Sequence, residues 1–332
     1  MPTQSDKLTT LREQAAPGEI PYISKSRLLK FKKCPEQFRW SYIQGLREPE
    51  TTAMARGTAI HETFEDFYHN VTEHVNEVGT FPEDLVAFLP DSTRWADYTE
   101  PYISNFINFE RRRWKAVNEY GAPSVEDLLY LWLPAAIEAE AWVDEPWEDY
   151  DGPPWMGYAD AIYWAPSVPG AEGGYDDVVI IDHKTGKTPI EKYRDEGIYL
   201  QGTYYRLLFE QDGYSVSGVG GYYPKKDDLI LSPLSEERVA LVYELVAELL
   251  RLSRTDQSPW ELNEQPLCKW GAGDDEQCSF YDICGSRWGE PLKHDDRLRD
   301  LVQQGMSSYQ IAQELDCETH HVNYAKKKLN LS

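Results

Sequence analysis

The chain has 332 residues and a formal net charge of −24, from 33 Lys and Arg against 57 Asp and Glu. Its 41% hydrophobic and 13% aromatic content is enough to bury a core and excludes a wholly disordered chain. No apolar run approaches the roughly 20 residues of a membrane span, and the polar N-terminus lacks the apolar stretch of a signal peptide. We therefore expect a soluble, cytoplasmic protein without a membrane partner.

Acidic residues are concentrated in the middle of the chain. Residues 51–292 carry 45 Asp and Glu against 18 Lys and Arg, whereas residues 1–50 have a slight positive excess and residues 293–332 are neutral. A nucleic-acid partner usually calls for a basic surface. Two explanations are open: a partner other than nucleic acid, or adaptation to the salty interior of a halophilic cell, where charge repulsion is screened. We favour the second.

The first predicted element is a cationic helix. Residues 1–20 are expected to form a flexible N-terminal tail, and residues 24–34 combine a serine cap with apolar positions typical of a helix. Five cations within nine residues are unusual in an acidic chain, so we interpret the segment as a phosphate contact rather than only a solvated helix face. The five are Lys25, Arg27, Lys30, Lys32 and Lys33.

The middle of the chain predicts an α/β core preceded by a large helical insertion. Apolar periodicity predicts helices over residues 53–78 and 101–120, with a loop over 80–100 between them. Strands are predicted over residues 155–164, 178–181 and 216–223, and helices over 196–212 and 235–253. This order of elements favours a central mixed sheet flanked by helices.

The C-terminal residues 293–332 predict a small all-α module. Three short helices separated by Gly305 and by a break at Asp316 have the spacing of a helix-turn-helix, whose second helix enters the DNA major groove. A three-helix protein-interaction module is the alternative. The candidate base-reading residues are Thr319, His320, Asn323 and Tyr324, and the candidate phosphate contacts are Lys326, Lys327 and Lys328.

Carboxylates at two predicted strand ends indicate a metal site. Asp160 ends a Gly-x-x-Asp pattern on one strand, and Asp182 closes the apolar run of another. Such carboxylates can hold a hard divalent ion such as Mg²⁺. The backbone carbonyl of His183 could add an oxygen, and His61 on the helix over 53–78 could add an imidazole, which suits Mn²⁺ as well.

Three further side chains fit hydrolysis at that metal site. Lys184 lies two residues beyond Asp182, so the two side chains point to the same side of a strand. An ammonium there can orient an attacking water and stabilise charge that builds on a phosphate. Gln201 and Tyr205 are four residues apart on one helix face, where they could hold the lysine or the scissile phosphate.

In this order, the motifs resemble the RecB-like branch of the PD-(D/E)XK nuclease superfamily, over residues 22 to about 288. The resemblance implies a restriction-endonuclease-like core and phosphodiester hydrolysis dependent on Mg²⁺ or Mn²⁺. It assigns the metal to His61, Asp160, Asp182 and the carbonyl of His183. It assigns catalysis to the two carboxylates together with Lys184, Gln201 and Tyr205.

Four cysteines sharpen the resemblance. Cys34 precedes the first motif, and Cys268, Cys278 and Cys284 follow the core. They resemble the iron-sulfur nucleases of the AddB type and the CRISPR-associated Cas-four family, where one early and three late cysteines hold a 4Fe-4S cluster. Nine residues separate Cys268 from Cys278, where the family usually has two, through an insert containing residues 271–275. A structural Zn²⁺ would suit the same thiolates.

The resemblance implies a DNA exonuclease that acts on single strands or DNA ends, in repair, recombination, replication or CRISPR adaptation. Its domains would be the nuclease at residues 21–290 and the helix-turn-helix at 293–332. DNA would be the partner, a separate helicase or a recombination or CRISPR adaptation protein could act with it, and the oligomeric state stays open. The alternative is a catalytically inactive, DNA-binding regulator with a nuclease fold. A small-molecule hydrolase or transferase is disfavoured, because the chain has no phosphate-binding P-loop and no nucleophile elbow.

Overall fold

The computed structural model describes residues 10, 11, 19–46, 48, 52–90, 101–254, 260–263, 268, 278–280, 283, 295–329 and 331. The chain divides into two compact units, one formed by residues 1–29 and 50–256 and the other by residues 30–49 and 257–332. Most of the predicted tail over residues 1–20, part of the predicted loop over 80–100 and the insert over 271–275 lie outside the described residues.

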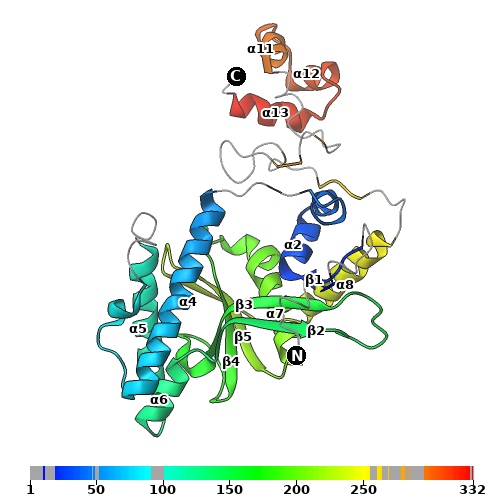
Figure 1. Ribbon diagram of the computed structural model, residues 1–332. Coiled ribbons are helices and arrows are strands. Elements are labelled where there is room, and N and C mark those ends of the chain that lie inside the picture. Colours follow the sequence, from blue (N-terminus) through cyan, green and yellow to red (C-terminus); the bar gives the residue numbers. More distant parts are fainter. Residues whose placement is uncertain are drawn as a thin grey trace. The chain divides into compact units, whose positions relative to one another are not determined.

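A six-stranded mixed sheet forms the centre of the first unit (Figure 1). The strands are β1 (Ile23–Ser24), β2 (Ala136–Val143), β3 (Trp155–Trp164), β4 (Asp177–His183), β5 (Ser215–Tyr223) and β6 (Asp228–Ser232). The path runs β1-β3-β4-β5-β6, and β2 pairs with β3. β4 and β5 are parallel, as are β1 and β3, while the remaining pairs are antiparallel. The predicted mixed sheet is confirmed, although the sequence did not predict β1, β2 or β6.

One edge of β3 is shared by two strands. β1 pairs there with Trp155 and Met156, and β4 pairs with residues 161–164. β1 runs parallel to β3 and β4 runs antiparallel to it, so the C-terminal ends of β1 and β4 point toward one another. Residues 157–160 of β3 lie between those two ends. The backbone therefore brings residues that follow β1 and residues that end β4 to Asp160.

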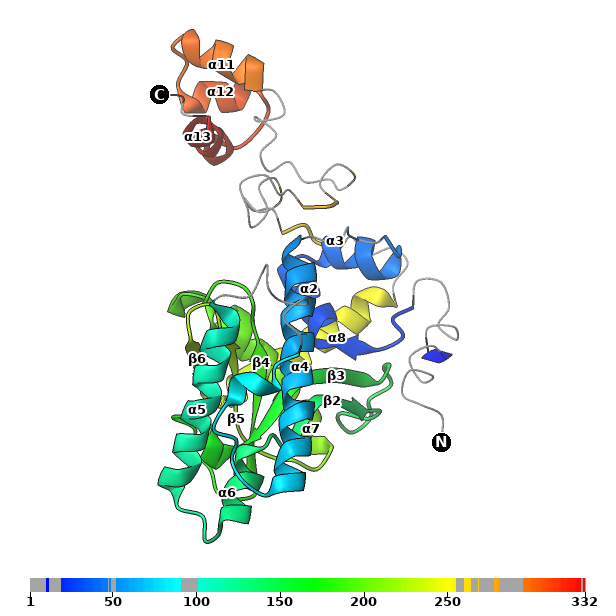
Figure 2. The same ribbon diagram turned by 60° about the vertical axis from the view of Figure 1, so that its left-hand side comes forward.

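Helices α4 (Thr52–Val78), α5 (Tyr102–Tyr120) and α6 (Val125–Trp132) pack on one face of the sheet (Figure 2). Their apolar side chains form one buried cluster with Ala161, Tyr163, Val179, Ile181 and Tyr222 of the strands. The Phe64 and Phe106 rings stack with 3.8 Å between their centroids, which joins α4 to α5. The predicted helices over residues 53–78 and 101–120 thus cover the sheet from one side.

Helices α7 (Leu200–Gln211) and α8 (Glu236–Ser253) pack against each other, and α7 contacts β5. A Cβ atom on Gly202 would come within 2.6 Å of Val219, so glycine permits this close approach of helix and strand. Val219 and Tyr222 lie on opposite faces of β5, because side chains alternate along a strand. Since Tyr222 stacks on Phe109 of α5, α7 covers the other face of the sheet.

Short helices and helical turns connect the longer elements. Helix α2 (Lys25–Lys33) follows β1 directly, and α3 (Pro35–Phe38) leads into a π-helical turn, Arg39–Ile43. A second π turn, Asp195–Tyr199, precedes α7, and 3-10 turns cover Leu85–Phe88, Ala165–Ser167 and Glu191–Tyr193. Across the described ranges, no helix is both long enough and apolar enough to span a bilayer.

Three C-terminal helices have their own small core. They are α11 (Asp295–Gln303), α12 (Ser308–Glu314) and α13 (Thr319–Lys328), and Leu298, Ile311, Val322 and Ala325 are buried between them. Ser307 and Gln310 form a capping box, in which each side chain bonds the backbone of the other residue at the start of α12. The three helices predicted here are confirmed, while their DNA-binding role stays a prediction.

Candidate metal centre and catalytic site

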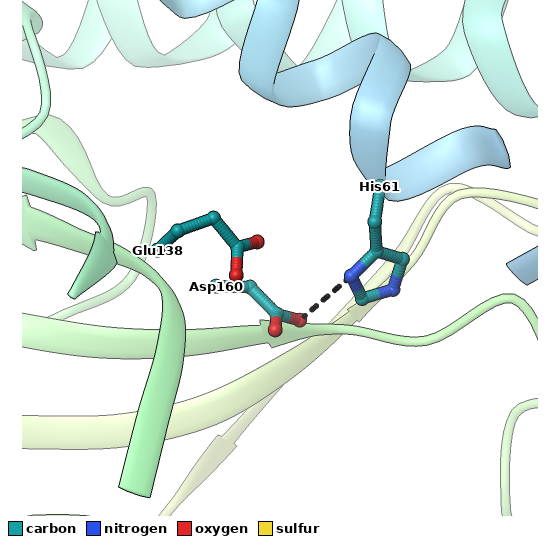
Figure 3. A group of neighbouring side chains, drawn as sticks. All are labelled: His61, Glu138 and Asp160. Atoms are coloured by element: carbon teal, nitrogen blue, oxygen red, sulfur yellow. Dashed lines mark ion pairs between the residues drawn. The ribbon is translucent and has the colours of Figure 1, made fainter. Parts of the chain in front are cut away.

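His61, Glu138 and Asp160 form a group that could hold a metal ion (Figure 3). One ligand atom from each lies within 4.8 Å of the others, and His61 Nδ1 is 3.6 Å from Asp160 Oδ2. His61 Nε2 is 2.8 Å from the carbonyl oxygen of His183. A carbonyl only accepts, so Nε2 carries the proton and the Nδ1 lone pair is left for a metal. The predicted carbonyl of His183 thus orients the imidazole in this structure.

Glu138 is a site residue that the sequence analysis missed. It stands opposite Asp160, because the register pairs Ile137 with Ala161 and Ala139 with Ala159. Its φ angle of 45° lies in the left-handed region, which costs free energy for a residue other than glycine and often marks functional sites. The alternation of Glu and apolar residues over 136–143 is a strand signal, but the register with β3 cannot be found from it.

Both carboxyl groups of this site have a raised pKa, and burial is the largest cause for each. Burial, and then the nearby charge of Asp182, raises the pKa of Asp160 to about 6. Burial, and then the charge of Asp160, raises the pKa of Glu138 to about 7. The ionised form of each carboxyl group is therefore disfavoured, and a bound cation would offset this cost. Two carboxylate oxygens and an imidazole nitrogen are suitable ligands for Mg²⁺ or Mn²⁺, so these residues fit the predicted ion.

Asp182 is buried between two lysines. Its Oδ1 atom is 2.9 Å from Lys25 Nζ, and its Oδ2 atom is 2.5 Å from Lys184 Nζ. Burial alone would raise the pKa of Asp182, but the two ammonium groups hold it below its ordinary value. Asp182 is not part of the three-residue group above. Its neighbour His183 connects the two, since the His183 backbone N–H donates to Asp160 Oδ2 over 2.6 Å.

The imidazole of His183 lies in the core rather than at the metal group. Its Nε2 atom is 3.1 Å from the hydroxyl of Tyr163, and burial lowers the pKa of His183 to about 3. The ring therefore stays neutral. The backbone of His183 is the part of this residue that contacts His61 and Asp160, while the role of its carbonyl as a metal ligand stays a prediction.

Gln201 and Tyr205 both lie on α7 and are buried. The Tyr205 ring centroid is 5.1 Å from Lys25 Nζ, and the two side chains are hydrogen-bonded. Among the described residues, Gln201 Nε2 has no hydrogen-bond partner. A Cβ atom on Gly157 would come within 2.8 Å of Leu208 and 3.1 Å of Tyr205, which explains the glycine of the Gly-x-x-Asp motif. The lysine that Tyr205 contacts is therefore Lys25, rather than the Lys184 considered from the sequence.

The described members of the predicted cluster, Cys34, Cys268 and Cys278, fall in the second unit. Asn263 links two of their segments, because its Nδ2 donates to the carbonyl of Lys33, beside Cys34, and its own carbonyl is 3.6 Å from Cys268 Sγ. The Cys278 N–H donates to the Cys268 carbonyl over 3.0 Å. Burial, and then Cys268, raises the pKa of Cys278. No three cysteines within the described ranges form a metal-ligand group, and Cys284 lies outside those ranges.

The candidate DNA contacts differ in exposure. Within the second unit, the Lys30 ammonium donates to the Glu48 carboxylate and to the hydroxyl of Ser41, with 3.2 Å between Lys30 Nζ and Ser41 Oγ. Arg27 is buried and donates a hydrogen bond to the Tyr22 carbonyl. Arg27 and Lys30, two of the predicted phosphate contacts, therefore already have hydrogen-bond partners within the protein. Lys32 is half-buried and Lys33 is exposed. On α13, His320, Asn323 and Lys327 are exposed, and Thr319 and Lys326 are half-buried. The side chains of the other two candidates, Tyr324 and Lys328, lie outside the described part of the structure.

Comparison with known proteins identifies the family. A family model described as the PD-(D/E)XK nuclease superfamily matches residues 22–285. Curated proteins yield no match to the chain. The matched range includes the whole sheet, the metal-ligand group and the Asp182–Lys184 pair, and it confirms the restriction-endonuclease-like fold expected from the sequence. The chain therefore belongs to the PD-(D/E)XK nuclease superfamily.

Proposed function

We propose that the protein is a deoxyribonuclease of the RecB-like branch that hydrolyses phosphodiester bonds with Mg²⁺ or Mn²⁺. One observation carries this proposal: the metal-ligand group His61, Glu138 and Asp160 lies beside the ion pair of Asp182 and Lys184. The first set offers ligands for a hard cation, and the second offers a fixed ammonium. A nuclease needs both, because its substrate is a phosphate diester that gains negative charge in the transition state.

The roles of the residues follow from their contacts. His61, Glu138 and Asp160 would hold the ion, with Asp182 and the His183 carbonyl next to them. When bound, the ion would polarise the phosphate and offset its charge. Asp182 holds the Lys184 ammonium in place, and that ammonium can donate hydrogen bonds to the attacking water and to a phosphate oxygen.

We further propose exonuclease action on single strands or DNA ends, with any unwinding supplied by a separate chain. The support is the RecB-like order of motifs around His61, Asp160, Lys184 and Tyr205. End-labelled linear DNA and circular single-stranded DNA should be compared in the presence of Mn²⁺ and of EDTA. Degradation of the linear substrate alone, abolished by EDTA, is expected. Rapid cutting of the circle would contradict exonuclease action.

We propose that Cys34, Cys268, Cys278 and Cys284 hold a 4Fe-4S cluster. The support is their number, their order and the grouping of the three described ones in one compact unit. Anaerobically purified protein should be brown and contain about four iron atoms per chain. Colourless protein with one tightly bound zinc ion would support the alternative, a structural Zn²⁺ site.

We propose that the C-terminal helices bind DNA as a helix-turn-helix. His320, Asn323 and Lys327 recur at helical spacing and are exposed on α13, where a recognition helix would present them. The double variant Asn323→Ala/Lys327→Ala of the full chain should bind duplex DNA more weakly in fluorescence anisotropy, with unchanged Mn²⁺ binding. Unaltered DNA affinity would instead favour a protein-interaction module.

We also propose that the acidic composition is an adaptation to high salt. The net charge of −24 creates long-range repulsion, which salt screens. The free energy of unfolding in urea should therefore rise between dilute buffer and about 2 M KCl. A stability that is constant or falls over this range would contradict the adaptation.

A further inference from the structure

Lys25 is a second lysine on the carboxylate of Asp182. It is the first residue of α2, and its Nζ atom lies 2.9 Å from Asp182 Oδ1. Lys184 already supplies one ammonium, to the other oxygen. The Lys25 side chain is 20% exposed, compared with 32% for Lys184, so Lys25 is the more deeply placed of the two.

The neighbouring strands and helix α7 fix the position of Lys25. It directly follows β1, which pairs with β3 and ends opposite Met156. The hydroxyl of Tyr204 on α7 is 3.0 Å from the carbonyl oxygens of both Ile23 and Met156, which ties β1 to β3. The Lys25 ammonium is then held by Asp182 on one side and by Tyr205 on the other. A flexible surface lysine has no such support.

The positive charge of Lys25 opposes the binding of a metal ion at the neighbouring carboxylates. Asp182 carries one negative charge and faces two ammonium groups, and the charge of Lys25 also acts on Asp160. A divalent ion held by Asp160 would therefore be repelled by the Lys25 ammonium, because like charges repel strongly at a site that is largely removed from water.

We propose that Lys25 is the counter-ion of Asp182, a positioning residue that fixes this carboxylate and lowers the affinity of the DNA-free site for divalent cations. This inference rests on the proposed metal-dependent function. It assigns the two lysines different tasks: Lys184 acts on the substrate, and Lys25 sets how readily the site takes up an ion. A lysine that served only the fold would leave the affinity for the ion unchanged when its charge is removed.

Calorimetric titration of Mn²⁺ into the DNA-free protein at about pH 8, where the carboxylates are ionised, tests the proposal. The variant Lys25→Met should bind Mn²⁺ roughly tenfold more tightly than the parent. Lys25→Gln also removes the charge but keeps a hydrogen-bond donor for Asp182, and it should show the same gain in affinity. It replaces the Met variant in the experiment if that variant does not fold. Lys25→Arg keeps the charge and should bind as the parent does.

Lys225→Met is the matched control, because it removes an exposed positive charge from the same unit without contacting the site. Its Mn²⁺ affinity should equal that of the parent. Parent-like or weaker binding in both Lys25→Met and Lys25→Gln would overturn the inference. Equal Mn²⁺ binding by the parent and by Asp160→Asn would instead overturn the proposed metal site, so the two failures are distinguishable.

Discussion

Replacing Asp160 by Asn should stabilise the metal-free protein while abolishing its metal binding. Asn has nearly the same shape, and its side-chain oxygen can still accept the hydrogen bond from the His183 backbone N–H. The substitution therefore removes the charge of Asp160 and little else. In the native protein that charge is buried and faces Asp182, so its loss relieves desolvation and repulsion.

The magnitude follows from the pKa. Raising the pKa of Asp160 from 3.8 to about 6 costs the ionised native state about 3 kcal/mol relative to the unfolded chain. Because the native pKa is the higher one, the native state holds this proton more tightly, and stability falls as pH rises from about 4 to above 6. The advantage of Asp160→Asn should accordingly be near zero at about pH 3 and approach 3 kcal/mol at about pH 8.

Urea unfolding in EDTA across this pH range measures the effect. Asp177→Asn is the matched control, because hydrogen bonds from the Gly174 backbone and from Ser215 lower the pKa of Asp177. Removing that charge should give no stabilisation at high pH. With Mn²⁺ at about 100 times its dissociation constant, the parent should gain about 2.7 kcal/mol and the Asp160→Asn variant nothing. If Asp160→Asn is less stable than the parent in EDTA at pH 8, the electrostatic reasoning about this site is wrong.

Three other substitutions probe separate parts of the molecule. Glu138→Gln should weaken Mn²⁺ binding by at least about tenfold in calorimetry, and unchanged affinity would remove Glu138 from the metal group. Arg113→Met leaves Glu110 buried without its cation and should cost about 3–5 kcal/mol in urea unfolding; a loss below about 1 kcal/mol would show that the pair is dispensable. Ser307→Ala breaks the capping box and should destabilise α12 by about 1 kcal/mol in hydrogen exchange, with DNA hydrolysis retained; unchanged protection would argue against the cap.

Local sequence patterns were sufficient for the long elements of the fold. The apolar residues Ile60, Phe64, Phe67 and Val71 recur at helical spacing, and α4 buries all four. The apolar run over 178–181 predicted a buried strand that ends near Asp182, as β4 does. Both signals are contained within one segment, so no knowledge of distant residues was required.

The site residues that the sequence did not predict owe their positions to contacts with strands far away in the chain. Glu138 joins the site only because β2 pairs with β3 in one register, and its alternating segment does not specify that partner. The sequence groups Lys25 with four neighbouring cations as a phosphate contact, but β1 places it at the end of a strand that points toward the end of β4. Its position beside Asp182 follows from residues more than 150 positions away.

The most direct test of the central claim is the Mn²⁺-dependent release of nucleotides from end-labelled DNA by the parent and by Lys184→Ala. Lys187→Ala, which removes an exposed lysine three residues further along, serves as the control. The account predicts that Lys184→Ala loses at least about a hundredfold in rate while folding and Mn²⁺ binding are retained, and that the control matches the parent. Equal rates for the parent and Lys184→Ala would contradict the assignment of the active site.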